Sequence, residues 1–140
     1  MTKIDEIGGL MSQSVQLYAL WAHKKGLNYN SLAVFYGALN YQHCTQKQIS
    51  TQWSLPKQTV FSVCKQLHAQ GLLDFEPAQQ DKREKILTLT AKGEAFARPI
   101  VDEIRAIEMQ VVQSFGEQEI VDFIEKLQQF NQIVAQHTQE

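Results

Sequence analysis

The chain has 140 residues, of which 44% are hydrophobic, a composition that supports a folded core and excludes a disordered tail. No apolar run reaches the length that spans a bilayer, and the first ten residues lack the pattern of a secretory signal, so we expect a cytoplasmic protein. The net charge is −2, yet residues 45–93 carry seven basic against four acidic residues, whereas residues 94–140 carry three against nine. The basic middle of the chain is therefore the surface suited to face phosphate.

The first third of the chain predicts two helices. Apolar residues recur at helical spacing over residues 5–25, and Gly26 follows a lysine pair as a stop signal. A second helix is expected over residues 31–41, with Asn30 as its cap and with apolar side chains three and four positions apart.

A helix-turn-helix pattern follows. Thr45 and Gln48 have the spacing of a capping box that opens a short helix. Ser54 is expected to cap the next helix, with Pro56 in its first turn and Gly71 at its end. An apolar stripe with the offsets 0, 3, 4 and 7 is expected to anchor that helix in the core: Val60, Val63, Cys64 and Leu67.

The opposite face of this helix carries amide, hydroxyl and ammonium groups, which suit base edges and phosphates in a DNA major groove. The expected DNA-contacting residues of this recognition helix are Pro56, Lys57, Gln58, Thr59, Phe61, Ser62 and Lys65. Phe61 has two interpretations, since it either packs against a neighbouring helix or contacts a thymine methyl group.

Residues 72–76 and 84–90 are expected to form a β-hairpin because the second segment alternates apolar and polar residues. Its charged tip supplies the expected DNA contacts of a wing: Asp81, Lys82, Arg83 and Lys85. Arg83 is the proposed minor-groove probe, and Asp81 orients its guanidinium group. A solvated turn with incidental charges is the alternative.

Two helices are expected after the hairpin. Thr90 is a cap for the first, which runs to about Ser114, and Ser114 with Glu117 has the spacing of a capping box for the last. The last helix, to about Gln136, has an apolar stripe that needs a partner surface, from the same chain or from another.

Other chemistries lack support in the sequence. The four histidines have no ligand spacing, and no glycine-rich phosphate loop occurs, so we expect no enzyme activity, metal or cofactor. Cys64 falls on the core stripe and is expected to be buried, whereas Cys44 lies at a helix junction where it could be exposed to oxidants.

From about Leu27 to Gly93 the chain resembles the winged-helix domain of the MarR family (multiple antibiotic resistance regulators). The matching motifs are T-Q-x-Q-I from Thr45, P-K-Q-T-V from Pro56, L-x-x-x-G-L from Leu67, D-x-R from Asp81 and L-T-x-x-G from Leu89. The flanking helices also match the family's dimerisation architecture, so the resemblance extends over essentially the whole chain.

The resemblance implies a mainly α fold with a small β-hairpin wing: a winged helix-turn-helix plus a helical dimerisation region. Residues 1–30 would form an N-terminal dimerisation helix, residues 31–90 the DNA-binding domain, and residues 91–140 the C-terminal dimerisation helices. The implied function is transcription regulation by a homodimer on a pseudo-palindromic operator, most often repression.

The resemblance also implies release from DNA by a small aromatic or amphipathic effector in a crevice that Tyr18, Trp21 and Tyr36 could line. As ordinary core aromatics, these three need no ligand. The alternative function is a winged-helix protein-interaction or dimerisation module that does not bind DNA, although such a module has no need for cations at a hairpin tip.

Overall fold

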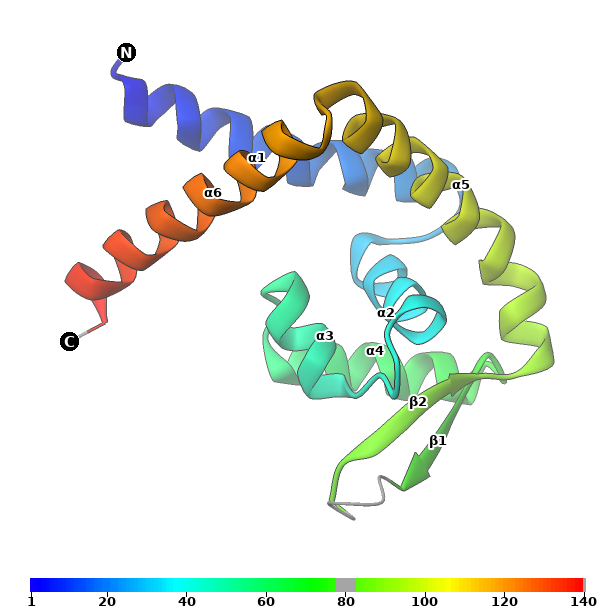
Figure 1. Ribbon diagram of the computed structural model, residues 1–140. Coiled ribbons are helices and arrows are strands. Elements are labelled where there is room, and N and C mark those ends of the chain that lie inside the picture. The colour runs from blue at the N-terminus through cyan, green and yellow to red at the C-terminus, as the bar shows by residue number, and fades with distance from the viewer. Residues whose placement is uncertain (78–82, 140) are drawn as a thin grey trace. The chain divides into compact units, whose positions relative to one another are not determined.

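The computed structural model describes residues 1–77 and 83–139. In chain order its elements are α1 (Lys3–Lys24), α2 (Tyr29–Asn40), α3 (Gln46–Trp53), α4 (Lys57–Ala69), β1 (Leu73–Pro77), β2 (Lys85–Leu89), α5 (Ala91–Phe115) and α6 (Glu117–Thr138). The predicted fold class, mainly helical with a small antiparallel hairpin, is confirmed (Figure 1). The chain divides into two compact units, Met1–Val101 and Asp102–Glu140.

The first two helices begin earlier than the sequence predicted. At the start of α1, the Thr2 hydroxyl accepts a hydrogen bond from the Asp5 N–H (3.2 Å), and the Asp5 carboxylate accepts one from the Thr2 N–H (2.8 Å). In α2 the cap is Asn28, whose side-chain oxygen accepts a hydrogen bond from the Ser31 N–H at 2.8 Å. The assignment of Asn30 as the cap is therefore wrong, because that residue already lies inside α2.

The turn between α3 and α4 is tight. Thr45 caps α3 as predicted, accepting a hydrogen bond from the Gln48 N–H at 3.2 Å. Ser54 does not cap α4, because it adopts a left-handed conformation (φ 50°) at the end of α3. Its N–H donates a hydrogen bond to the Ser50 carbonyl in the last turn of α3. Pro56 occupies the cap position of α4 without a side-chain hydrogen bond, so it precedes the first turn and does not form part of it.

The core of the first unit depends on the stripe of α4. Its four predicted members are all buried, with Val63 the most accessible at 9%. α2 contacts α3, α4 and β2 (Figure 1). It contributes Leu32 and Phe35, which are fully buried. Because the stripe is buried, the opposite face of α4 must point outward at 100° per residue.

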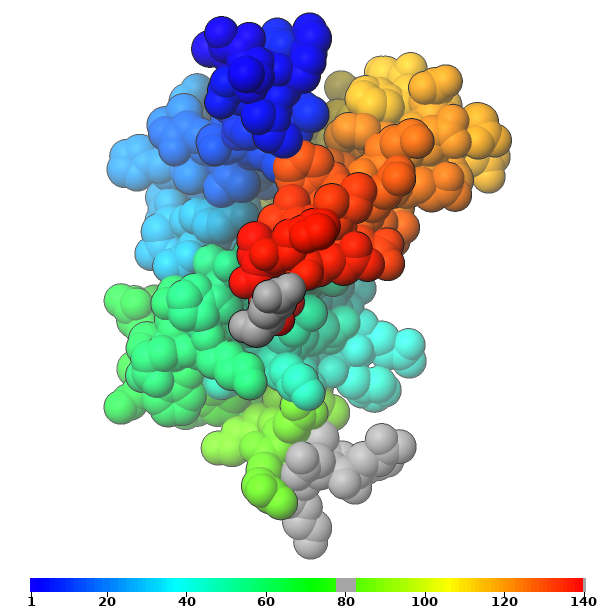
Figure 2. Space-filling view, turned by 90° about the vertical axis from the view of Figure 1, so that its left-hand side faces the viewer, coloured from blue at the N-terminus to red at the C-terminus, as the bar shows by residue number. Residues whose placement is uncertain are grey.

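The predicted hairpin is confirmed. β1 and β2 pair antiparallel, with Leu73 opposite Leu89 and Phe75 opposite Leu87. The hairpin is also attached to the start of α3, because the Leu87 N–H donates to the Cys44 carbonyl at 2.8 Å and Ile86 forms a β-bridge with Thr45. In the space-filling view the hairpin projects beyond α3 and α4 (Figure 2).

The end of α4, the base of the hairpin and the start of α5 meet at one junction. The Thr90 hydroxyl donates to the Gly71 carbonyl (2.6 Å) and accepts from the Gly93 N–H (3.0 Å), which confirms Thr90 as a cap. The Thr90 N–H donates to the Leu72 carbonyl at 3.2 Å. A Cβ at Gly93 would lie 2.0 Å from that carbonyl oxygen, so the close approach of α5 to Leu72 requires glycine.

Both cysteines are buried in the first unit. Cys64 lies on the core stripe as predicted, and Cys44, for which exposure was considered, is only 1% exposed. Burial raises the pKa of each thiol to about 12, and in Cys64 the nearby Cys44 adds to the effect. These thiols therefore lack the thiolate character that oxidant sensing needs.

The second unit consists of the remainder of α5 and the helix α6. Ser114 lies in the last turn of α5, so it does not cap α6. Gly116 takes the cap position with φ 83°, a left-handed conformation that glycine adopts without strain. The rings of Phe115 and Phe123 are 5.9 Å apart across this turn, and no residue of α6 within the described part of the chain is buried. No described helix is both long enough and apolar enough to cross a bilayer.

We predict that Gly93→Ala destabilises the first unit by about 3 kcal/mol, because the added methyl group forces α5 away from the Leu72 carbonyl. Gly9→Ala is the matched control, since Gly9 also lies in a helix but a Cβ added there would have no atom within 4 Å. It should stabilise the protein by about 0.5–1 kcal/mol. Urea unfolding followed by circular dichroism measures both changes, and equal stabilities would contradict the close approach.

We also predict that a thiol reagent such as an aromatic disulfide labels the native protein slowly at pH 8 and labels both cysteines rapidly in guanidinium chloride. The folded pKa of about 12 exceeds the ordinary value of 9.0 expected for an unfolded chain, so the thiols add stability below pH 9. That contribution declines as the pH rises toward 12. Rapid labelling of the native protein at pH 8 is the contrary outcome.

Candidate nucleic-acid interface

The outer face of α4 is accessible to a partner. Of the seven residues predicted for DNA contact, Thr59 is half-buried and six are exposed: Pro56, Lys57, Gln58, Phe61, Ser62 and Lys65. Because the buried stripe fixes the rotation of the helix, these side chains point away from the core together. Phe61 is 50% exposed, so it does not pack fully against a neighbouring helix.

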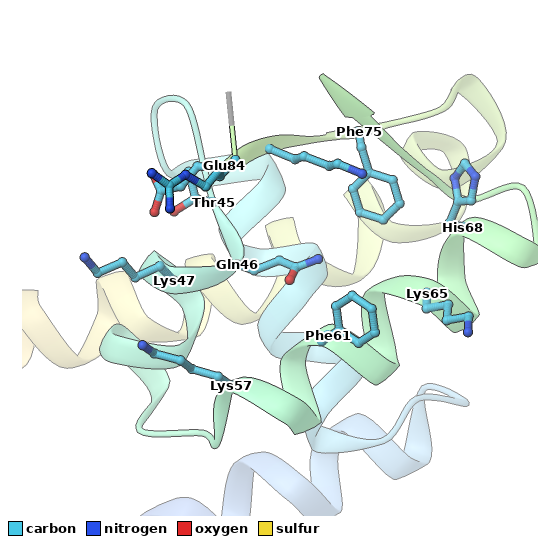
Figure 3. Close-up of a pocket in the computed structure, with 11 residues that line it drawn as sticks. Thr45, Gln46, Lys47, Lys57, Phe61, Lys65, His68, Phe75 and Glu84 are labelled. Atoms are coloured by element: carbon cyan, nitrogen blue, oxygen red, sulfur yellow. The ribbon is translucent and has the colours of Figure 1, made fainter. Parts of the chain in front are cut away.

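A cavity of about 610 Å³ lies between this face of α4, the start of α3 and the hairpin. We call it the interface groove. Figure 3 shows the Phe61 ring rising from α4 into the groove, with Phe75 of β1 on the opposite side and Gln46 of α3 between them. The groove thus joins three elements that are separate in the sequence.

The interface groove is strongly cationic. Five basic side chains line it: Lys47, Lys57, Lys65, Arg83 and Lys85. Glu84 is the one carboxylate among the described residues that line the groove. Such an excess of positive charge at a concave surface attracts a polyanion.

Only part of the predicted wing can be placed. Arg83 and Lys85 both line the interface groove, and the Lys85 ammonium lies over the Phe75 ring at 5.5 Å. Asp81 and Lys82 lie outside the described residues, so the expected orientation of Arg83 by Asp81 stays a prediction.

Sequence reasoning missed Lys47, His68 and Phe75. Lys47 enters the groove because the Thr45–Ile86 bridge brings the start of α3 next to the hairpin. His68 lies near the end of α4, where its Nδ1 is 2.8 Å from the Leu73 carbonyl oxygen and its ring is 5.0 Å from Phe75. The hydrogen bond requires a proton on Nδ1, so His68 connects the recognition helix to β1.

The three aromatic residues predicted to line an effector crevice occupy two helices. Tyr18 and Trp21 are half-buried one turn apart on α1, and the Lys25 ammonium lies 5.6 Å from the Trp21 ring. Tyr36 is 7% exposed and packs edge-on against Trp53, with ring centroids 5.4 Å apart.

Another cavity, of about 520 Å³, is lined by other residues of the first unit, among them Leu27, Phe35, Leu67 and Phe96. Within the described ranges, no group of three histidine, cysteine, aspartate or glutamate side chains is arranged to hold a metal ion.

Known proteins with the same sequence pattern and fold are transcription regulators. A sequence profile of the MarR family matches residues 26–84. The HTH-type transcriptional regulator Hpr of Geobacillus thermodenitrificans (strain NG80-2) is 31% identical over 82 residues. That match covers 59% of this chain and 41% of Hpr, so the chain spans less than half the length of this relative.

Solved structures extend the relationship beyond the winged domain. A MarR family regulator from Neisseria meningitidis is 32% identical, with a TM-score of 0.86 over 98% of this chain and 96% of that chain. A MarR from Staphylococcus aureus in complex with salicylate and kanamycin has the same fold at 21% identity, with a TM-score of 0.64 over 95% and 90% of the two chains.

The relationship to the Neisseria regulator covers nearly the whole of both chains at an identity well above that expected from shared fold alone. It agrees with the exposed recognition helix, the hairpin beside it and the cationic groove between them. The chain therefore belongs to the MarR family, whose members are winged-helix transcription regulators that bind DNA.

Proposed function

We propose that the protein is a homodimeric repressor that binds a pseudo-palindromic DNA operator and is released by a small-molecule effector. The observation that carries the proposal is the interface groove, where five basic side chains surround the outer face of α4. In this arrangement α4 enters the major groove, and the hairpin reaches the adjacent minor groove with Arg83.

The phosphate contacts come from residues on three elements. Lys57 and Lys65 extend from α4, Lys47 from α3, and Lys85 from β2, so they neutralise phosphates on both sides of the inserted helix. Phosphate contacts of this kind set the position of the helix on the duplex, and the groups at the middle of α4 then read the bases.

In this proposal, residues 31–90 bind DNA, and residues 1–30 and 91–140 form the dimer. Large apolar side chains on α1, α5 and α6 are exposed in the single chain, which supports a partner surface on these helices. On α6 these include Phe123 and Ile124, which are 51% and 48% exposed. Two recognition helices of such a dimer would bind half-sites about one helical turn apart.

Effector release is proposed for an aromatic or amphipathic molecule that binds near Tyr18, Trp21 and Tyr36. The S. aureus MarR of the same fold was solved with salicylate, an aromatic acid of this class. An effector that prefers one spacing of the two recognition helices would shift the population of the dimer away from the DNA-binding form.

We predict that Arg83→Ala weakens operator binding by about 1–3 kcal/mol. We also predict that Lys65→Ala lowers the slope of log K against log salt by about one unit, because one phosphate is no longer neutralised. Both residues line the interface groove. Lys24→Ala is the control, because Lys24 is exposed on α1 and does not line that groove. Fluorescence anisotropy with operators selected from random duplexes gives these values.

Affinity and salt slope that stay unchanged in both groove variants would contradict the proposed interface. A wild-type protein that binds no duplex at low salt would instead favour the protein-interaction module.

We predict that Ile124→Glu reduces dimerisation, because it places an unpaired charge in the proposed partner surface of α6. Gln129→Glu is the matched control, since this exposed residue lies on the opposite side of the same helix. Sedimentation equilibrium should show dimers for the wild type and for the control, and monomers at micromolar concentration for Ile124→Glu. A monomeric wild type would overturn the homodimer.

A further inference from the structure

The position of Phe61 on α4 is unusual for an apolar side chain. It is 50% exposed and lies on the flank of the outer face that lines the groove. Lys57 is one turn away toward the start of the helix, and Lys65 is one turn away toward its end. Figure 3 shows its ring directed into the interface groove, toward Phe75. An exposed aromatic ring therefore lies in the interface groove between two lysines of α4.

Phe61 contributes little to the buried core. The stripe of Val60, Val63, Cys64 and Leu67 already anchors α4 in the core, and Phe61 lies off that stripe. The cations around it also make the site a poor surface for an apolar protein partner, because docking would bury their charges without compensation.

The DNA major groove offers a surface with the matching pattern of charge and apolar groups. Phosphates line its two edges, where the ammonium groups of Lys57 and Lys65 can reach them. On its floor, the edges of guanine, cytosine and adenine present polar donors and acceptors, whereas thymine adds a C5-methyl group. A phenyl ring has no hydrogen-bonding group, so the thymine methyl is the natural contact for it.

We propose that Phe61 is a specificity-determining residue that selects thymine by packing against its C5-methyl group in each half-site. The inference rests on the proposed function, since it requires α4 to enter the major groove. It goes further by naming the base and the atom that the helix reads at its centre. Phe61 acts through shape and burial, and the lysines beside it hold the helix at the depth where the contact forms.

Substitution of thymine by uracil tests this contact directly, because uracil keeps the base pair and its polar edge and lacks only the methyl group. Each thymine of a selected operator is replaced singly by deoxyuridine, and affinity is measured by anisotropy. We expect about a fourfold loss at one position in each half-site, the equivalent of about 0.8 kcal/mol for one buried methyl group. Replacement of both symmetry-related thymines should cost about 16-fold.

The variant Phe61→Ala should bind thymine and uracil operators equally at that position. Gln58→Ala is the matched control, since Gln58 is a neighbouring exposed residue of the same face and should retain the preference for thymine. Circular dichroism verifies that both variants fold, which the half-exposed position of Phe61 favours.

Two results overturn the inference while leaving the proposed function intact. One is a wild-type protein that binds its operator specifically but does not distinguish uracil from thymine at any position. The other is a Phe61→Ala protein that keeps the full preference for thymine. Failure of the wild-type protein to bind any duplex would contradict the proposed function itself, and the inference with it.

Discussion

The burial of one stripe on α4 is the constraint on which the interface depends. Four side chains at helical spacing, Val60, Val63, Cys64 and Leu67, are removed from water when this stripe packs into the core. Full burial of a valine or leucine side chain contributes on the order of 1.5–3 kcal/mol. Burial of the stripe fixes the rotation of the helix, so Gln58, Ser62 and Lys65 face away from the core. Lys57 and Phe61 flank them on the side that lines the groove. A rotation of α4 by one residue, about 100°, would move these groups off the side of the helix that lines the groove.

The groove needs a second condition, which is a fixed distance between α4 and the hairpin. Several polar contacts supply it. The Leu87 N–H is bound to the Cys44 carbonyl, His68 is bound to the Leu73 carbonyl, and Thr90 is bound to Gly71. Because these contacts exist within the single chain, the groove is already formed before any partner arrives, which reduces the entropy that binding must overcome.

Local patterns in the sequence were sufficient for the elements and for the outer face of α4. The offsets of Val60, Val63, Cys64 and Leu67 identify the buried stripe without knowledge of any contact, and alternation identifies β2. The caps were less predictable. Asn28 and Asn30 are chemically equivalent, and Ser54 has a good capping side chain, so the backbone path decides which residue serves.

The remaining parts of the site depend on contacts between distant residues. Lys47 and His68 join the groove through pairings with residues on the hairpin, and no spacing within α3 or α4 reveals those pairings. Cys44 is buried for a similar reason, since its neighbours include Gly37 and the backbone of Leu87.

The junction at Thr90 and Gly93 has a mechanical consequence. Hydrogen bonds and the close approach to Leu72 fasten the base of the hairpin to the first turn of α5. A tilt of that turn therefore carries the hairpin with it, together with the start of α3, which is bonded to β2. β2 extends about 17 Å from that pivot at about 3.3 Å per residue. A tilt of about 10° at the first turn of α5 would swing Lys85 by about 3 Å, which is the length of a hydrogen bond. A small reorientation of one helical turn is thus magnified into a displacement large enough to break a hydrogen bond made by the Lys85 ammonium group.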